Sequence, residues 1–213
     1  MKIALIGASG FVGTAVLHEA LNREHGVTGL VRHPQKLPEH AALTAVAADV
    51  YDVEALAKQI AGHDAVIHAF NPGWDNADIR ALFIRGTQAI YAAVKQAGVK
   101  RLLVVGGAGS LYVAPGVQLI DTPDFPAEYK EGAEGARQAL DLLKAETRLD
   151  WSFISPPAHL HLGERSGQFR IGGEQLLMKD GEPAGISVAD LAVAIIDELE
   201  HPAHIRQRFT VGY

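Results

Sequence analysis

The chain has 213 residues, 48% of them hydrophobic, and a formal net charge of −6 at pH 7. This size predicts one domain over residues 1–213 around one substantial core, and no apolar run reaches the roughly 20 residues of a membrane span, so a cytoplasmic protein is expected. The dispersed acidic charge argues against nucleic-acid partners, and the lack of cysteine excludes thiolate nucleophiles, disulfides and Cys-ligated metals.

The first predicted strand, Ile3–Ile6, leads directly into a turn with three glycines at three-residue spacing. From Val12 to Leu21, apolar residues then recur at helical intervals. Such a turn lets backbone approach a pyrophosphate with no Cβ in the way, and a helix N-terminus offers unpaired N–H groups to the anion. The spacing GxxGxxG differs from the more frequent GxGxxG, and a structural turn is the alternative. The residues expected to contact the cofactor here are Gly7, Ser9, Gly10, Phe11, Val12 and Gly13.

Strand and helix patterns alternate along the rest of the chain. Strands are predicted at 27–32, 43–47, 64–69, 101–105 and 151–154. Helices are predicted from 53 to near 62 behind the cap Asp52, at 78–96 before Gly98, at 128–144, and at 187–199 behind the capping pattern Ser187-Val188-Ala189-Asp190. The alternation predicts an α/β fold, a Rossmann-type doubly wound parallel sheet with helices on both faces. Its ligands bind beyond the carboxyl ends of the strands.

The type of dinucleotide is indicated by Arg32, which ends the second predicted strand. A site for NAD would have an acidic residue there, whereas a guanidinium can bind the 2′-phosphate of NADP through two hydrogen bonds. Because Arg32 could also be a solvated residue, we expect NADP and leave NAD possible. Asp49-Val50 stands where a carboxylate could accept from the adenine amino group, although Asp49 could equally be a turn residue.

The segment Phe70-Asn71-Pro72-Gly73-Trp74 follows the fourth strand. Its rings could stack on a planar substrate, or they could simply pack the loop. We expect Phe70, Asn71 and Trp74 to line the substrate site, with His159 as a further wall. His159 and His161 have no third ligand nearby, so no metal site is expected.

Together these motifs resemble the NmrA-like group of atypical short-chain dehydrogenases/reductases, and within it the bacterial proteins described as NADH-flavin reductases. The resemblance covers nearly the whole chain and is carried by KIALIGASGFVG, GLVRHPQKL, AADVYD, DAVIHAF, RLLVVGGAGSLYV, LDWSFISPPA, GERSGQFRIGGEQLL and ISVADLAVAIIDELEHPAHIRQRFTVGY. It implies an NAD(P)-binding Rossmann domain with a small C-terminal substrate region.

The resemblance also implies where the parts of the cofactor lie. It places the pyrophosphate at Gly7, Gly10 and Gly13, the adenosine at Arg32 and Asp49, the ribose and nicotinamide at Ala69, Phe70 and Gly107, and a backbone rest for the nicotinamide at Pro156.

The proton-donating residues of the wider superfamily are incomplete in this sequence. Those proteins use a serine and Tyr-x-x-x-Lys, where the tyrosine protonates a carbonyl oxygen. Here Tyr129 is followed four residues later by Ala133, Gly107 occupies the expected serine position, and Ser110 lies three residues beyond it. Tyr129 and Ser110 are therefore weak catalytic candidates.

Flavin N5 accepts hydride directly and takes its proton from water, so no tyrosine donor is required. We therefore expect an NAD(P)H-dependent reductase of a planar small molecule such as a flavin or quinone. A non-catalytic redox sensor that binds a protein partner is the alternative, and an epimerase or dehydratase is a weaker one. The sequence leaves the oligomeric state open.

Overall fold

Eight strands form one central sheet in the order β10-β14-β8-β5-β4-β1-β2-β3. In the computed structural model, which describes residues 1–213, all neighbouring strands are parallel except β10, which runs antiparallel to β14. The strands of this sheet are β1 Lys2–Ile6, β2 Gly26–Val31, β3 Leu43–Ala47, β4 Ala65–His68, β5 Arg101–Val105, β8 Asp150–Ser155, β10 Arg170–Gly172 and β14 Gln207–Gly212. The predicted parallel sheet is confirmed.

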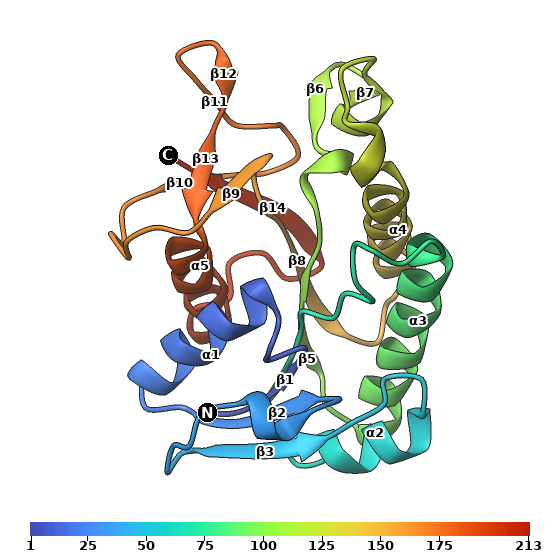
Figure 1. The fold of residues 1–213 in the computed structure, drawn as a ribbon, viewed down its shortest axis with the longest axis vertical. Helices are drawn as coiled ribbons and strands as arrows, with labels where there is room; N and C mark the ends of the chain where they lie inside the picture. The colour runs from blue at the N-terminus through green and yellow to red at the C-terminus, as the bar shows by residue number, and fades with distance from the viewer.

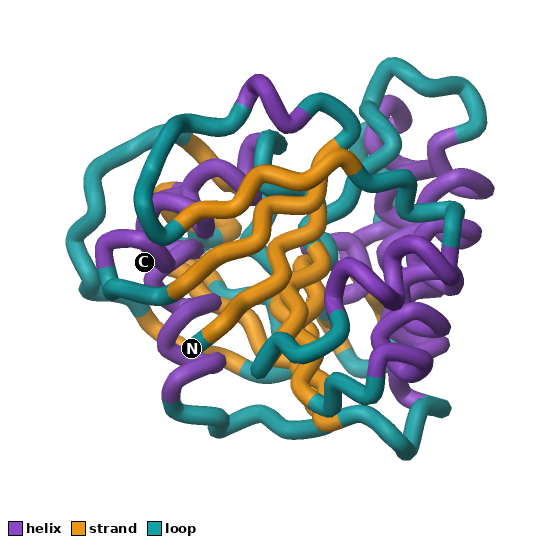
Figure 2. Tube along the Cα trace, turned by 90° about the horizontal axis from the view of Figure 1, so that it is seen from below, coloured by secondary structure: helices purple, strands orange, loops and turns teal.

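Helices cover both faces of the sheet, as the doubly wound pattern predicts (Figures 1 and 2). They are α1 Phe11–Asn22, α2 Val53–Ile60, α3 Ile79–Ala97, α4 Ala127–Lys144 and α5 Val188–Glu200. One face carries α1 and α5, and the other carries α2, α3 and α4. The Rossmann-like fold class is therefore confirmed.

The sheet separates two hydrophobic clusters of 23 buried residues each. Alternate residues of one strand contribute to different clusters: Ile3 and Leu5 point towards α1 and α5, while Ala4 and Ile6 point towards the opposite helices. This follows from the two-residue repeat of a strand. Because both faces are covered, the central strands appear in the sequence as short uninterrupted apolar runs.

The helix ends use the residues that the sequence suggested. Asp52 Oδ1 accepts a hydrogen bond from the N–H of Ala55 at 3.0 Å, and Ser187 Oγ accepts one from Asp190 at 3.0 Å. Gly98 ends α3 in the left-handed region with φ of 74°, a conformation that glycine adopts at no steric cost. The predicted boundaries of these helices differ from the observed ones by at most about a turn.

Several short strands were not predicted, and they gather at one end of the molecule, at the top of Figure 1. They are β6 Tyr112–Ala114 with β7 Val117–Gln118, β9 His159–His161 with β13 Gly185–Ser187, and β11 Met178–Lys179 with β12 Glu182–Pro183. Strands β10 and β14 of the main sheet were also missed. Three 3₁₀ turns complete the structure, η1 Pro34–Lys36, η2 Ala108–Ser110 and η3 Leu119–Asp121.

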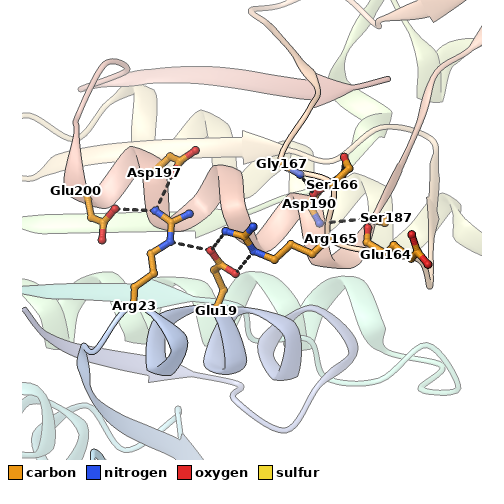
Figure 3. A network of polar contacts seen from close by, with 10 residues as sticks. All are labelled: Glu19, Arg23, Glu164, Arg165, Ser166, Gly167, Ser187, Asp190, Asp197 and Glu200. Carbon is orange, nitrogen blue, oxygen red and sulfur yellow. Dashed lines mark hydrogen bonds and ion pairs between the residues drawn. The ribbon is translucent and has the colours of Figure 1, made fainter.

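The segment between β9 and β10 is tied to both helices of one face (Figure 3). Arg165 donates two hydrogen bonds of 2.8 Å to the Glu19 carboxylate on α1, which also accepts from Arg23 at 2.7 Å. Hydrogen bonds from Arg165, and from Arg23, hold the pKa of Glu19 below its usual value.

Asp190 at the start of α5 anchors the next residues of the same segment (Figure 3). Its carboxylate accepts from Ser166 Oγ at 2.5 Å, from Gly167 N–H at 2.8 Å and from Tyr213 Oη at 2.7 Å. The segment is thereby fixed against α5, as Arg165 fixes it against α1, the helix that follows the glycine turn.

Candidate functional site

The glycine turn lies where the strand order reverses, between β1 and β4. The N–H of Gly7 donates to Leu30 O at 3.0 Å, and the N–H of Ala69 donates to Ile6 O at 3.0 Å, so the turn stands between the ends of β2 and β4. In open parallel sheets this switch point is where ligands bind.

Two of the three glycines are required by the protein itself. Gly7 has φ of 84°, and a Cβ there would come within 2.5 Å of Ala69 O. A Cβ on Gly13 would come within 2.0 Å of Gly7 O. No relaxation of a side chain could relieve these backbone contacts, so both positions need glycine for the fold.

Gly10 is different, because nothing in the protein excludes a side chain there. Its φ is −80°, it is exposed, and a Cβ would meet only Gly7 O, at 3.3 Å. No side chain caps α1, and the N–H groups of Phe11, Val12 and Gly13 in its first turn have no acceptor in the protein. A bare Cα beside free N–H donors at a helix N-terminus fits a pyrophosphate.

The other predicted cofactor residues lie at the same carboxyl edge of the sheet. Each follows the end of a different strand: Arg32 after β2, Asp49 and Val50 after β3, Ala69 and Phe70 after β4, Gly107 after β5 and Pro156 after β8. The sheet therefore brings these residues, far apart in sequence, to one edge.

At the adenosine end of this edge, Arg32 is exposed and makes no ion pair or hydrogen bond within the protein. Asp49 Oδ1 accepts from the N–H of Tyr51 at 2.9 Å, the turn contact that the sequence left open as an alternative. Its second carboxylate oxygen remains available. Val50 is buried.

Sequence reasoning missed Tyr51 and Arg85 at this end. The guanidinium of Arg85, from α3, stacks 4.4 Å from the centre of the Tyr51 ring. Burial raises the pKa of Tyr51, while the nearby cations Arg85 and Arg32 oppose that rise. Nothing in the sequence indicated that Arg85 belongs to the site, because a single exposed arginine in the middle of a long helix forms no motif with its neighbours.

The aromatic residues after β4 divide into two groups. Phe70 is half-buried and packs on α3, where a Cβ on Gly86 would come within 2.4 Å of its ring, and it stacks on Phe83 at 6.3 Å. Trp74 is 55% exposed and meets the exposed ring of Tyr129 edge-on, with 5.4 Å between centroids. Trp74 and Tyr129 therefore offer ring surface to a ligand, while Phe70 mainly fills space beside α3.

The remaining substrate candidates are polar and exposed. Asn71 Oδ1 accepts from the N–H of Gly73 at 2.8 Å, which closes its own turn. His159 lies on β9. No group of three or more His, Asp or Glu side chains is arranged to hold a metal ion.

The two catalytic candidates lie in different environments. Ser110 is in η2 just beyond β5, buried, and accepts a hydrogen bond from Arg208. Tyr129 is in the first turn of α4, and Ala133, where a lysine would stand, is buried. A Cβ at Gly107 would have Ala136 Cβ as its nearest neighbour, at 3.6 Å, so the missing serine does not follow from a lack of space.

His68 ends β4 with its ring completely buried. Its Nδ1 accepts from the N–H of Phe70 at 3.2 Å, so the proton is on Nε2, which lies 3.1 Å from Thr87 Oγ1. Burial lowers the pKa of His68 from 6.5 to about 4. His68 is thus a neutral residue that holds the backbone just before the aromatic loop.

The buried His68 predicts a loss of stability in acid. Above pH 6.5 it is neutral in both states, while between about pH 6.5 and 4 only the unfolded chain takes up the proton. Stability should therefore fall with falling pH by up to about 3 kcal/mol, with no further loss from this residue below about pH 4. Urea unfolding at pH 7, 5.5 and 4.5 measures this change in the free energy of unfolding. His68→Asn should flatten the profile, and an unchanged slope would contradict the assignment.

No helix of the structure combines the length and hydrophobicity required to cross a membrane.

Several known proteins are similar to this chain over nearly its whole length. The chain is 40% identical over 216 residues to the uncharacterized protein YwnB of Bacillus subtilis, covering 99% of this chain and 98% of that protein. A crystal structure from Bacteroides thetaiotaomicron, titled "putative epimerase", is 45% identical, with a TM-score of 0.92 and coverage of 100% of this chain and 96% of the other. A Streptococcus pneumoniae protein titled "putative NADH-flavin reductase" is 36% identical, with a TM-score of 0.84 and coverage of 100% and 99%.

The sequence pattern of the NAD(P)H-binding family matches residues 7–202, which include the glycine turn and all five helices. Strand β1 precedes the matched residues and β14 follows them. The elements that this match spans are those that bring the candidate residues to one edge. The chain therefore belongs to the NAD(P)H-binding family.

Proposed function

We propose that the protein is an NAD(P)H-dependent reductase that passes hydride to a planar small molecule such as a flavin or quinone. The observation that carries the proposal is the pairing of exposed aromatic rings, Trp74 and Tyr129, beside a cofactor edge where Ala133 replaces the lysine partner of a proton-donating tyrosine. The similarity to the Streptococcus protein supports the same class of reaction.

The residues of the chain have separate tasks in this proposal. The free N–H groups at the start of α1 hold the pyrophosphate, and Trp74 and Tyr129 hold the acceptor by its face. The bound cofactor supplies a hydride, and the acceptor takes its accompanying proton from water. Holding the two planar groups in contact can supply much of the rate without a protein acid.

The cofactor that we propose is NADP, because Arg32 has no partner within the protein and stands where a 2′-phosphate would lie. A cytoplasmic location and a small-molecule partner, with neither nucleic acid nor membrane bound, complete the proposal. The dispersed acidic charge of the chain supports the absence of a nucleic-acid partner.

Two other functions make different predictions. A redox sensor would bind NADPH tightly without turnover. An epimerase, the class in which the similar Bacteroides protein is named, would depend on Tyr129 as an acid. Following NADPH absorbance with and without added FMN or menadione separates these functions. Steady acceptor-dependent oxidation supports the reductase, and its absence with both acceptors contradicts it.

The mechanism predicts how two variants of the aromatic pair will behave. Tyr129→Phe keeps the ring and should change kcat less than about tenfold, because a general acid would contribute roughly 10²–10⁴. Trp74→Ala removes the exposed ring and should raise KM for the acceptor while leaving kcat similar. Single-turnover and steady-state assays with saturating NADPH measure both. A thousandfold loss in Tyr129→Phe would instead favour carbonyl reduction or epimerisation.

A further inference from the structure

Two arginines are buried in the central sheet with similar partners, Arg101 at the start of β5 and Arg208 in register with the middle of β8. Arg101 on β5 donates to Ser152 Oγ at 2.8 Å and to Glu198 Oε1 at 3.0 Å. Arg208 on β14 donates to Ser110 Oγ at 3.1 Å and is paired with Glu174. In both arginines Nε is buried and has no partner.

The Arg101 group is closed within the protein. The hydroxyl of Ser152 has two acceptors of its own, Glu198 Oε1 at 2.8 Å and His204 O at 2.9 Å. The Glu198 side chain is only 3% exposed and also accepts from two backbone N–H groups. With its hydroxyl and carboxylate committed, this group can only be structural.

The Arg208 group is also buried, but its two serines lie at the carboxyl ends of the strands, since Ser155 ends β8 and Ser110 follows β5. Arg208 Nη1 donates to Ser110 Oγ and more weakly to Ser155 Oγ, at 3.4 Å. A guanidinium has no acceptor, so these contacts use the serine lone pairs and leave both hydroxyl hydrogens to point elsewhere. The protein provides no acceptor for either hydrogen, and the balancing Glu174 side chain is 45% exposed.

The position of Ser110 connects the Arg208 group to the cofactor edge. Ser110 is three residues beyond Gly107, within the turn that follows β5, and Ser155 ends the neighbouring β8 just before Pro156. Both Gly107 and Pro156 are proposed to border the nicotinamide. Ser155 is fully buried, whereas Ser110 retains 3% exposure, so the Ser110 hydroxyl is the one that we place beside the acceptor.

We propose that Arg208 is a positioning residue: by occupying a lone pair of Ser110, it directs the Ser110 hydroxyl hydrogen to a carbonyl oxygen of the acceptor. This rests on the proposed reductase function and narrows its substrate to planar acceptors with a carbonyl beside the atom that takes hydride. Flavins and quinones have such an oxygen, and it gains negative charge as the two electrons of the hydride arrive. Ser110 keeps its proton throughout.

The test compares two planar two-electron acceptors that differ in this oxygen, menadione with carbonyls and methylene blue without. Ser110→Ala and Arg208→Gln should each lower kcat/KM for menadione at least about tenfold, through KM for the hydrogen bond made on binding and through kcat for the charge that the oxygen gains. For methylene blue both variants should stay within about twofold of the original protein. Arg208→Lys, which keeps a charged donor, should recover part of the loss.

The Arg101 group supplies the matched controls. Ser152→Ala and Arg101→Gln remove the same chemical groups elsewhere in the sheet and should lower the unfolding temperature without changing the preference for menadione. Equal losses for both acceptors in Ser110→Ala, or the same loss of preference in Ser152→Ala, would overturn the proposal. If Arg208→Gln does not fold, Arg208→Lys tests the role of Arg208 in its place, and a preference for menadione equal to that of the original protein in Arg208→Lys would then contradict that role.

Binding separates failure of this inference from failure of the proposed function. Equilibrium dialysis of menadione and methylene blue against the protein with NADP⁺ requires no turnover. If the protein does not reduce menadione yet Ser110→Ala weakens its binding alone about tenfold, the reductase function is wrong and the role of Ser110 stands. If binding of menadione is absent or unchanged by Ser110→Ala, the inference fails.

Discussion

Gly10→Val is expected to abolish NADPH binding while the protein remains folded. A Cβ at Gly10 would meet only Gly7 O, at 3.3 Å, a tight contact that a shift of a few tenths of an ångström relieves, so the fold should accept a side chain there. The isopropyl group would instead stand over the free N–H groups of Phe11 and Val12, where we place the pyrophosphate. Titration of NADPH by fluorescence measures the loss, and circular dichroism checks the fold.

Two comparisons make this result interpretable. Gly26→Val places the same side chain at the amino end of β2, where the nearest atom to a Cβ is Met1 O at 3.9 Å, and it should bind NADPH normally. Gly13→Val should damage the fold itself, because its Cβ would come within 2.0 Å of Gly7 O. Normal NADPH binding by a folded Gly10→Val protein would place the cofactor elsewhere.

Arg32→Ala is expected to weaken binding of NADPH by about 1.5–3 kcal/mol, the contribution of hydrogen bonds to a charged group, with little change for NADH. The side chain is exposed and unpaired, so its removal should leave the stability of the protein nearly unchanged. Isothermal titration with both dinucleotides gives the two affinities.

Arg148→Ala is the control for charge, since it removes another exposed guanidinium at 71% exposure from a different part of the molecule. It should leave both affinities unchanged. If Arg32→Ala weakens NADPH and NADH equally, Arg32 does not read the 2′-phosphate. Arg85→Ala then becomes the next variant, because Arg85 is the other cation beside Tyr51.

The sequence predicted those parts of the fold in which local pattern and final environment agree. Runs such as Arg101–Val105 are buried on both faces, and long helices such as α3 and α4 repeat their apolar residues often enough to be recognised. Strands of two or three residues, such as β11 and β12, contain no full repeat. They form because tertiary neighbours pair with them.

The candidate site, like the fold, was predictable from the sequence only where its residues are neighbours along the chain. The glycine turn could be found because all its residues are consecutive in the sequence. The contact of Arg208 with Ser110 joins residues 98 positions apart, and its neighbours in β14 gave no reason to separate it from an ordinary surface arginine. For Phe70, the sequence predicted its position after β4 but not the packing of its ring on Gly86.

The two tryptophans give the protein two independent optical reporters. Trp151 is 3% exposed within the core and donates through Nε1 to Glu146 O, so its emission should respond to unfolding alone. Trp74 is 55% exposed beside Tyr129, at the proposed acceptor position, so its emission should be quenched by a bound flavin or quinone. Trp151→Phe, which keeps Trp74, should therefore report acceptor occupancy, and Trp74→Phe, which keeps Trp151, should report global stability, each without a label.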